Sequence, residues 1–204
     1  MLTALTLSFA LTTLLIELTP GPNMVWLALL SARKGRRVGF AALVGIALGL
    51  GVLALAAVFG LARLIAEHPS VYQAMCVAGV GFMVWLAWDA WRDPASQPGW
   101  PETIEDRRGF AFRRGLIINL LNPKAALFFL TVLPNFVDPL GAVTAQYLLL
   151  CVIYLVIASA IHVILVIGGE RLGKLIVKEA HSVAVRAGSA LALLGVAVWM
   201  LTKM

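Results

Sequence analysis

The stretch Glu17-Leu18-Thr19-Pro20-Gly21-Pro22-Asn23 interrupts an apolar run that extends from about Ala4 to Leu30. Pro20 and Pro22 remove two backbone donors and clash with the preceding turn, so a helix must break here. A break within an apolar run leaves amide and carbonyl groups that need protein or water as partners. Glu17 adds a group that is costly to bury, which favours a half-helix boundary lining a polar cavity over a purely structural kink.

The rest of the chain places this break inside a membrane protein. Of its 204 residues, 61% are hydrophobic and only 13% are charged, whereas soluble domains have about 45–50% apolar residues and about 25% charged residues. Most of the apolar runs reach the ~20 residues that cross a hydrocarbon core. There are six, and they predict an all-α polytopic membrane protein: Ala4–Leu30, Val38–Leu61, Val71–Trp91, Gly115–Val137, Val143–Gly168 and Ala187–Thr202.

A second break is predicted at Asn119-Leu120-Leu121-Asn122-Pro123-Lys124 in the fourth run. Each break lies in the first span of a three-span unit, and an odd number of spans makes the second unit insert upside down. Inverted units whose broken helices meet near the midplane are typical of secondary transporters. We therefore predict one domain over residues 1–204, with repeat one at about 1–91 and repeat two at about 115–204. Alternating access would need only rocking of one unit against the other.

The connector at about 92–114 contains Pro94, Pro98, Gly99 and Pro101, which predict a turn-rich strap rather than a folded unit. This connector is also one of three alternate connectors that hold thirteen of the sixteen Lys and Arg residues. Basic residues resist translocation, so we expect these connectors in the cytoplasm and both termini outside. No basic residue precedes the first run, so we expect it to be retained rather than cleaved as a signal peptide. The thirteen are Arg33, Lys34, Arg36, Arg37, Arg92, Arg107, Arg108, Arg113, Arg114, Arg171, Lys174, Lys178 and Arg186.

Several motifs together resemble the LysE/RhtB family of amino-acid exporters, which includes homoserine, threonine and leucine efflux-type transporters. The motifs are Thr19-Pro20-Gly21-Pro22-Asn23, Gly79-Val80-Gly81-Phe82-Met83-Val84-Trp85-Leu86, Leu121-Asn122-Pro123-Lys124-Ala125-Ala126-Leu127-Phe128-Phe129 and Leu133-Pro134-Asn135-Phe136-Val137. The resemblance covers essentially the whole chain. It implies a multi-pass exporter of amino acids or close derivatives in the bacterial inner membrane, driven by the proton gradient and not an enzyme.

The family's first break corresponds to Pro20, Pro22 and Asn23, and its second break to Asn122, Pro123 and Lys124. One position departs from the pattern, because several relatives have an aspartate where this chain has His162. The proton or amine-binding role of that position is therefore not carried over unchanged, and His162 is either a packing residue or a functional one.

The residue types at the breaks suit an amino acid. A carboxylate suits half-helix N-termini and a cation, and an ammonium suits exposed carbonyls and Glu17. We predict that substrate binds at Gly21, Asn23, Asn119, Asn122 and Lys124, unless Lys124 instead extends to the membrane interface. Glu17 is the only acidic residue well inside a predicted span, and we expect an isolated carboxylate that couples transport to protons, with His162 as the second proton-coupling candidate.

Two other function classes stay open, a passive channel and a membrane redox or assembly factor. A redox carrier should have reactive cysteines at the breaks, but Cys76 and Cys151 lie within apolar runs without Cys-x-x-Cys spacing. We predict no cofactor, because the sequence has neither a metal-ligand cluster nor a phosphate-binding Gly-x-x-x-x-Gly-Lys-Ser/Thr loop. The predicted partners are the substrate, protons and membrane lipid, not nucleic acid. The small residues Ala41, Gly45, Gly49 and Gly51 suit either close packing in the interior or a homodimer face.

Overall fold

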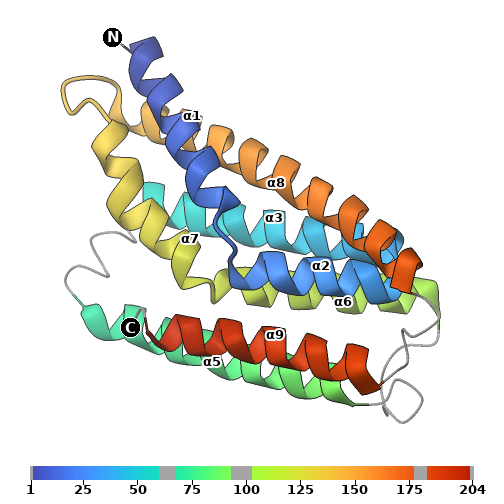
Figure 1. Ribbon diagram of the computed structural model, residues 1–204. Helices are drawn as coiled ribbons and strands as arrows, with labels where there is room; N and C mark the ends of the chain where they lie inside the picture. The colour runs from blue at the N-terminus through green and yellow to red at the C-terminus, as the bar shows by residue number, and fades with distance from the viewer. Residues whose placement is uncertain (1, 60–67, 93–102, 177–182, 203–204) are drawn as a thin grey trace.

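The computed structural model describes residues 2–59, 68–92, 103–176 and 183–202, and this part of the chain is helical (Figure 1). Its elements, in chain order, are α1 (Leu2–Leu18), α2 (Pro22–Lys34), α3 (Arg36–Val58), α5 (Pro69–Trp91), α6 (Ile104–Leu120), α7 (Pro123–Leu127), the π-helical η2 (Phe128–Val132), the 3₁₀-helical η3 (Leu133–Phe136), α8 (Val143–Ile176) and α9 (Val183–Leu201).

The helices are those of a multi-pass membrane protein. Helices α3, α5 and α8 are each long and apolar enough to cross a bilayer. Two bent helix pairs each form a further candidate span if the pair crosses the bilayer as one unit: α1 with α2, bent by 58°, and α6 with the segment Pro123–Phe136, bent by 46°. The apolar part of α9, Arg186–Leu201, is shorter than the other spans. The predicted sixth span and the inverted repeat therefore stay predictions.

Both bends occur at the predicted prolines, which confirms the two helix breaks. Helix α1 ends at Leu18, and α2 begins at Pro22, whose fixed φ and missing N–H suit the first position of a helix. At the second break, Asn122 precedes Pro123 and its side chain accepts a hydrogen bond from the backbone N–H of Lys124 at 3.1 Å. Each break is therefore a helix end followed directly by a new helix start.

The most extensive packing joins the two halves of the sequence: α3 lies on α6, α5 on α9, and α2 on α8. The two halves are therefore interleaved, and this packing does not support the prediction that residues 1–91 rock against residues 115–204, which stays a prediction. The pair α5–α9 packs much less against the rest of the bundle than its two helices pack against each other (Figure 1). Among the described helices, this pair makes the fewest contacts with its surroundings.

Glycines allow the closest of these crossings. A Cβ added at Gly45 of α3 would lie 2.1 Å from the Phe112 carbonyl oxygen, and one at Gly115 of α6 would lie 2.3 Å from that of Ala42. The α3–α6 crossing therefore requires glycine from both sides. Gly45 and Gly49 pack against α6 within one chain, so they serve the interior. The homodimer stays a prediction.

We expect Gly45→Ala to destabilise the fold, because its methyl group would meet backbone atoms that cannot move independently. Overpacking of this kind costs about 1–3 kcal/mol. A thermal unfolding scan of the detergent-solubilised protein should show a lower midpoint. Gly81→Ala is the matched control, because a Cβ at Gly81 has no atom within 4 Å. An equal midpoint for both variants would contradict the close contact between α3 and α6.

Helix α6 begins at Ile104, so the second half of the predicted strap is helical rather than turn-rich. The Thr103 hydroxyl accepts the Asp106 N–H, and Glu105 and Asp106 place negative charge in the first turn, which together favour a helix start. Sequence turn signals end at Pro101, which explains the misplaced boundary. Pro94, Pro98, Gly99 and Pro101 lie outside the described residues, as does Lys178.

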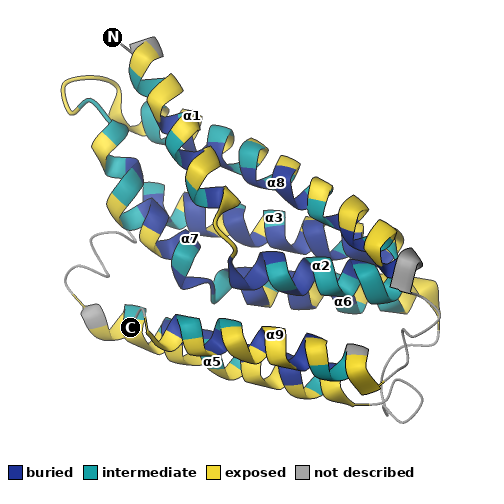
Figure 2. Cartoon of the chain, viewed as in Figure 1, coloured by how far each residue is buried: buried dark blue, intermediate teal, exposed yellow. Residues whose placement is uncertain are grey.

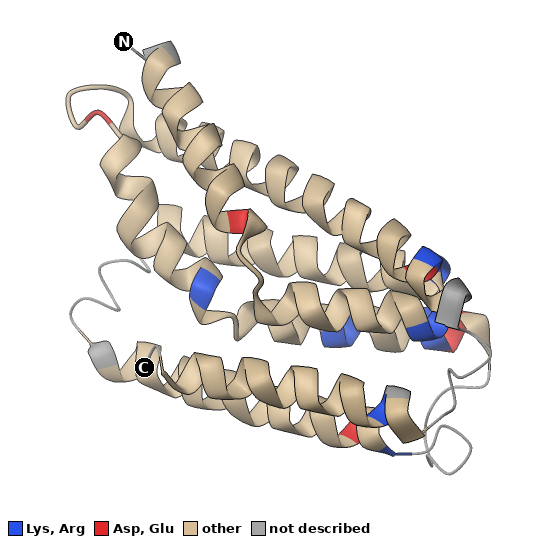
Figure 3. Cartoon of the chain, in the orientation of Figure 1, with Lys and Arg blue, Asp and Glu red and all other residues tan. Residues whose placement is uncertain are grey.

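The charged and apolar surfaces of the bundle are segregated. Basic residues gather at the end where α2 and α5 finish and α6 starts (Figure 3). Helix α1 starts and α9 finishes near the opposite end (Figure 1). Exposed residues run along the length of the bundle (Figure 2). They include the large apolar residues Leu15, Ile164 and Leu191, each more than 60% exposed. Such an apolar exterior suits lipid.

Candidate functional site

The two helix breaks meet inside the bundle through three buried asparagines. The Asn23 amide donates to the Asn119 side-chain oxygen at 3.2 Å, and the Asn122 amide donates to that of Asn23 at 3.3 Å. All three side chains are buried. The structure thus brings together the three asparagines that were predicted from the two separate motifs.

The cluster also includes His162 of α8 and has unused hydrogen-bonding capacity. The ring atom Nε2 of His162 lies 3.5 Å from the amide nitrogen of Asn23, and the ring is buried. The amide nitrogen of Asn119 is buried without a hydrogen-bond partner in the part of the chain that the structure describes. Such a group is costly to leave unsatisfied, so a ligand that accepts its proton would be favoured.

A second, charged part of the site lies beside the asparagines. The Lys124 ammonium donates to the backbone carbonyl of Thr19 at 2.7 Å and lies 3.8 Å from Oε1 of Glu17. The Tyr154 hydroxyl donates to the same Glu17 oxygen at 2.8 Å. Glu17 is therefore not the isolated carboxylate expected from the sequence. Lys124 does not extend to the interface either, because the carbonyl and carboxylate hold its ammonium inside the bundle.

Each charge of this pair is on the less favourable end of its own helix. Glu17 is in the last turn of α1, where the helix dipole is negative, and Lys124 is the second residue of α7, where the dipole is positive. The ion pair between the end of α1 and the start of α7 compensates both charges. The Thr19 carbonyl, which follows α1, is a suitable acceptor for a cation. The pair is stable only while the two helix ends face each other.

Gly21 separates the charged part from the asparagines and lies against the lysine. A Cβ at Gly21 would lie 3.3 Å from Cδ of Lys124 and 3.5 Å from the side-chain oxygen of Asn23. Gly21 also precedes α2 as its N-cap residue, and no side chain caps this helix. The N-terminus of α2 thus offers its backbone amides to the site, whereas Asn122 caps the N-terminus of α7.

Tyr154 is a site residue that sequence reasoning missed. It is fully buried on α8, and its ring packs against Phe128 and Phe129 at centroid distances of 4.4 Å and 4.9 Å. An aromatic residue in an apolar run is normally read as packing. The sequence feature that could have identified Tyr154 is its spacing of eight residues from His162, which places both residues on one helix face.

An apolar cavity of about 250 Å³ opens next to the charged pair. Lys124 lies in its lining, and most of the remaining lining comes from α1, η2 and α9, including Ile16, Phe128, Trp199 and Met200. The cavity therefore lies between the α5–α9 pair and the rest of the bundle. It offers an apolar space beside two charges.

A match to known proteins decides the family. The model of the LysE type translocator matches residues 14–204, nearly the whole chain. The chain belongs to the LysE type translocator family. The resemblance inferred from the Pro-Gly-Pro-Asn and Asn-Pro-Lys motifs is thereby confirmed, and both breaks lie inside the matched region.

Individual relatives of this LysE type translocator are moderately similar. It is 30% identical to an uncharacterized membrane protein of Pseudomonas aeruginosa, over 81% of this chain and 79% of that protein. It is 29% identical to a homoserine/homoserine lactone efflux protein of Salmonella typhimurium, over 74% of this chain and 73% of that protein. No solved structure matches the chain.

Proposed function

We propose that this LysE type translocator exports amino acids or close derivatives across the bacterial inner membrane, using the proton gradient and alternating access. The observation that carries the proposal is the paired Glu17 and Lys124 at the meeting point of two broken helices. A charge pair at span depth is costly, and such residues are typical of substrate and proton pathways. The relative named for homoserine and homoserine lactone efflux makes these two compounds the first substrates to test.

The geometry supports recognition of a zwitterion. In this structure the Lys124 ammonium occupies the position beside the Thr19 carbonyl and Glu17 that a substrate ammonium would need. We propose that the substrate carboxylate draws Lys124 away, helped by the Asn119 amide and the N-terminus of α2. The substrate ammonium then takes the place of Lys124 beside Glu17. The adjacent cavity accommodates the substrate side chain.

Proton coupling follows from competition at the same carboxylate. A protonated Glu17 no longer attracts an ammonium, so a proton arriving at Glu17 releases the substrate, and loss of that proton restores binding. Proton and substrate thus alternate on one group, which is the requirement for an antiporter. His162 contacts Asn23 and not Glu17, so we propose that it orients the asparagine cluster or carries the proton onward.

We assign the alternating movement to the α5–α9 pair. Its ties to the bundle are few, and the cavity beside Lys124 lies along its boundary. A shift of this pair would alter access to the charged site without disturbing the α3–α6 or α2–α8 crossings. No observation specifically favours the passive channel or the redox factor, and both cysteines, Cys76 of α5 and Cys151 of α8, are buried.

Export itself is tested by transport into inverted membrane vesicles, in which substrate is added to the cytoplasmic face. Vesicles with an acidic lumen should accumulate radiolabelled homoserine or its lactone when the protein is present. Vesicles without a pH gradient should only equilibrate them. Uptake that never exceeds equilibration, for these and the other amino acids, would favour the channel.

The proposed orientation, with both termini outside, is tested by cysteine labelling of intact cells on a background that lacks Cys76 and Cys151. Cysteines at the exposed positions Arg37 and Glu105, at the basic end, should be protected from an impermeant thiol reagent. Cysteines at Ser70 and Leu140 should react, and Leu140 is 96% exposed. Reaction at Arg37→Cys with protection at Leu140→Cys would reverse the orientation.

A further inference from the structure

A second pocket lies between α2, α5, α6 and α9, at the basic end of the bundle. It is small, about 50 Å³. Its apolar wall includes Trp26, Leu86 and Leu193, which are all buried. Its charged lining consists of Arg33, Lys34, Arg114 and Asp89, so positive charges exceed negative charges by two. None of these residues belongs to the site at the helix breaks.

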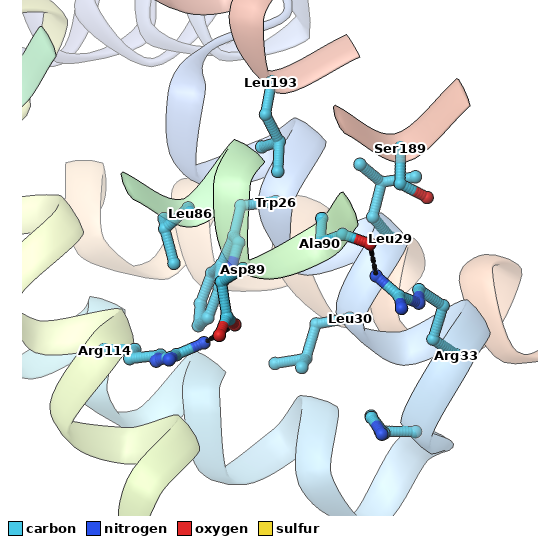
Figure 4. A pocket seen from close by; sticks show the side chains of 11 residues that line it. Trp26, Leu29, Leu30, Arg33, Leu86, Asp89, Ala90, Arg114, Ser189 and Leu193 are labelled. Atoms are coloured by element: carbon cyan, nitrogen blue, oxygen red, sulfur yellow. Dashed lines mark hydrogen bonds and ion pairs between the residues drawn. The ribbon is translucent and has the colours of Figure 1, made fainter. Parts of the chain in front are cut away.

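Two polar contacts cross this pocket, and both end on α5. Arg114 of α6 donates to the Asp89 carboxylate at 2.5 Å, and Arg33 of α2 donates to the Ala90 carbonyl at 3.3 Å. Figure 4 shows the two arginines reaching α5 from opposite sides of the pocket. Because α5 packs sparsely against α2 and α6, these two hydrogen bonds are among the main contacts that connect the α5–α9 pair to α2 and α6 at this end.

Arg114 is held in place by more than the ion pair. Its guanidinium carbon lies 4.3 Å from the ring centroid of Trp85 and 4.0 Å from that of Phe110. Stacked guanidinium groups keep a fixed plane, which suits bidentate recognition of a carboxylate. If Asp89 moved away, Arg114 would still present its donors to the pocket.

We propose that this pocket is the cytoplasmic recognition site for the carboxylate of the exported amino acid, which displaces Asp89 from Arg114. This proposal rests on the proposed function. The incoming carboxylate exchanges one ion pair for another, so Arg114 keeps a partner while α5 loses its ion pair with α6. Substrate on the cytoplasmic side thereby frees the α5–α9 pair to move.

The size and lining of the pocket support this assignment. A volume of about 50 Å³ holds a few water molecules, which matches the size of a carboxylate group. Because Asp89 already occupies Arg114, the substrate carboxylate reaches this arginine only after the Asp89–Arg114 contact opens. The excess of positive charge favours an anionic group, and the wall of Trp26, Leu86 and Leu193 is suited to the carbon atoms next to it.

The test compares a probe that has a carboxylate with one that lacks it, homoserine and homoserine lactone, in inverted vesicles. Arg33→Gln should raise the homoserine concentration for half-maximal transport about tenfold, because it removes a charged hydrogen-bond donor. The lactone has no carboxylate to open the Asp89–Arg114 contact, so its half-maximal concentration should be higher than that of homoserine in the parental protein and unchanged by Arg33→Gln. Asp89→Asn should lower the value for homoserine, because it removes the competing carboxylate. Arg36→Gln is the matched control, since Arg36 lies at the same end, is mostly exposed and does not line the pocket.

Several outcomes would overturn the proposal. Equal effects of Arg33→Gln on both probes, or a higher half-maximal concentration in Asp89→Asn, would remove the carboxylate exchange. If the parental protein moved neither probe, the proposed function would fail as well. Proteoliposomes of phosphatidylcholine, with and without phosphatidylglycerol, separate the substrate from a lipid phosphate. The Arg33→Gln effect should persist without the anionic lipid, and an effect confined to phosphatidylglycerol would assign the pocket to a lipid head group.

Discussion

Glu17→Gln should abolish export against a gradient. The glutamine keeps the size of the side chain and can still accept from Tyr154, but it cannot bind and release a proton. With one proton per substrate, a gradient of about one pH unit supports about tenfold accumulation in inverted vesicles. In the variant this ratio should fall to one, and exchange of labelled for unlabelled substrate should need a higher substrate concentration, because a neutral side chain attracts the substrate ammonium less.

Thr13→Val is the matched control for this experiment. Thr13 lies one turn before Glu17 on α1, is fully buried, and its hydroxyl has no partner among the described residues. Its replacement changes a buried polar group on the same helix without touching the charge pair, so accumulation should stay near the parental ratio. Undiminished uphill transport by Glu17→Gln would remove Glu17 from the coupling mechanism.

Lys124→Met should reduce kcat/KM for export about 100-fold, because loss of a charge-assisted contact to the substrate carboxylate costs roughly 3 kcal/mol. The substitution also leaves Glu17 buried without its cation. Loss of one partner of a buried ion pair costs about 3–5 kcal/mol of stability. The thermal midpoint in detergent should therefore fall together with the transport rate.

The double variant Glu17→Gln with Lys124→Met separates stability from binding. With both charges gone, the unfolding midpoint should return towards the parental value, whereas export should stay absent. Recovery of both properties would mean that Lys124 serves only to neutralise Glu17. Parental kinetics in Lys124→Met alone would place the substrate site elsewhere.

The parts of this protein that could be predicted from sequence are those governed by local backbone chemistry. Pro20, Pro22 and Pro123 cannot continue a helix, so the breaks follow from the sequence alone. Their meeting was predictable because the two motifs occupy equivalent places in the two halves. The retention of Lys124 inside the bundle was not predictable, because it depends on the Thr19 carbonyl and Glu17, which are more than a hundred residues away in the chain.

Features that depend on packing between helices distant in sequence could not be predicted from the sequence. The packing of α5 against α9 leaves no periodic signal in the sequence, because both helices are apolar on nearly every side. Asp89 accepts a hydrogen bond from Arg114, which belongs to the next described helix, and the sequence spacing of these two residues does not predict this contact. Tyr154 likewise became a site residue only through its position opposite Glu17.

The pairing of Glu17 with Lys124 has an electrical consequence. One unit of negative charge and one of positive charge lie together inside the barrier, so in the proposed cycle the step that carries a zwitterionic substrate moves no net charge. Movement of a unit charge through the full membrane potential is worth about 2.3 kcal/mol per 100 mV, and the substrate-bearing step avoids this cost or gain. With a proton on Glu17, the same site carries the positive charge of Lys124 alone. The membrane voltage, positive outside, would therefore drive the protonated carrier inward, which makes the proton-bearing half of the proposed cycle the voltage-sensitive one.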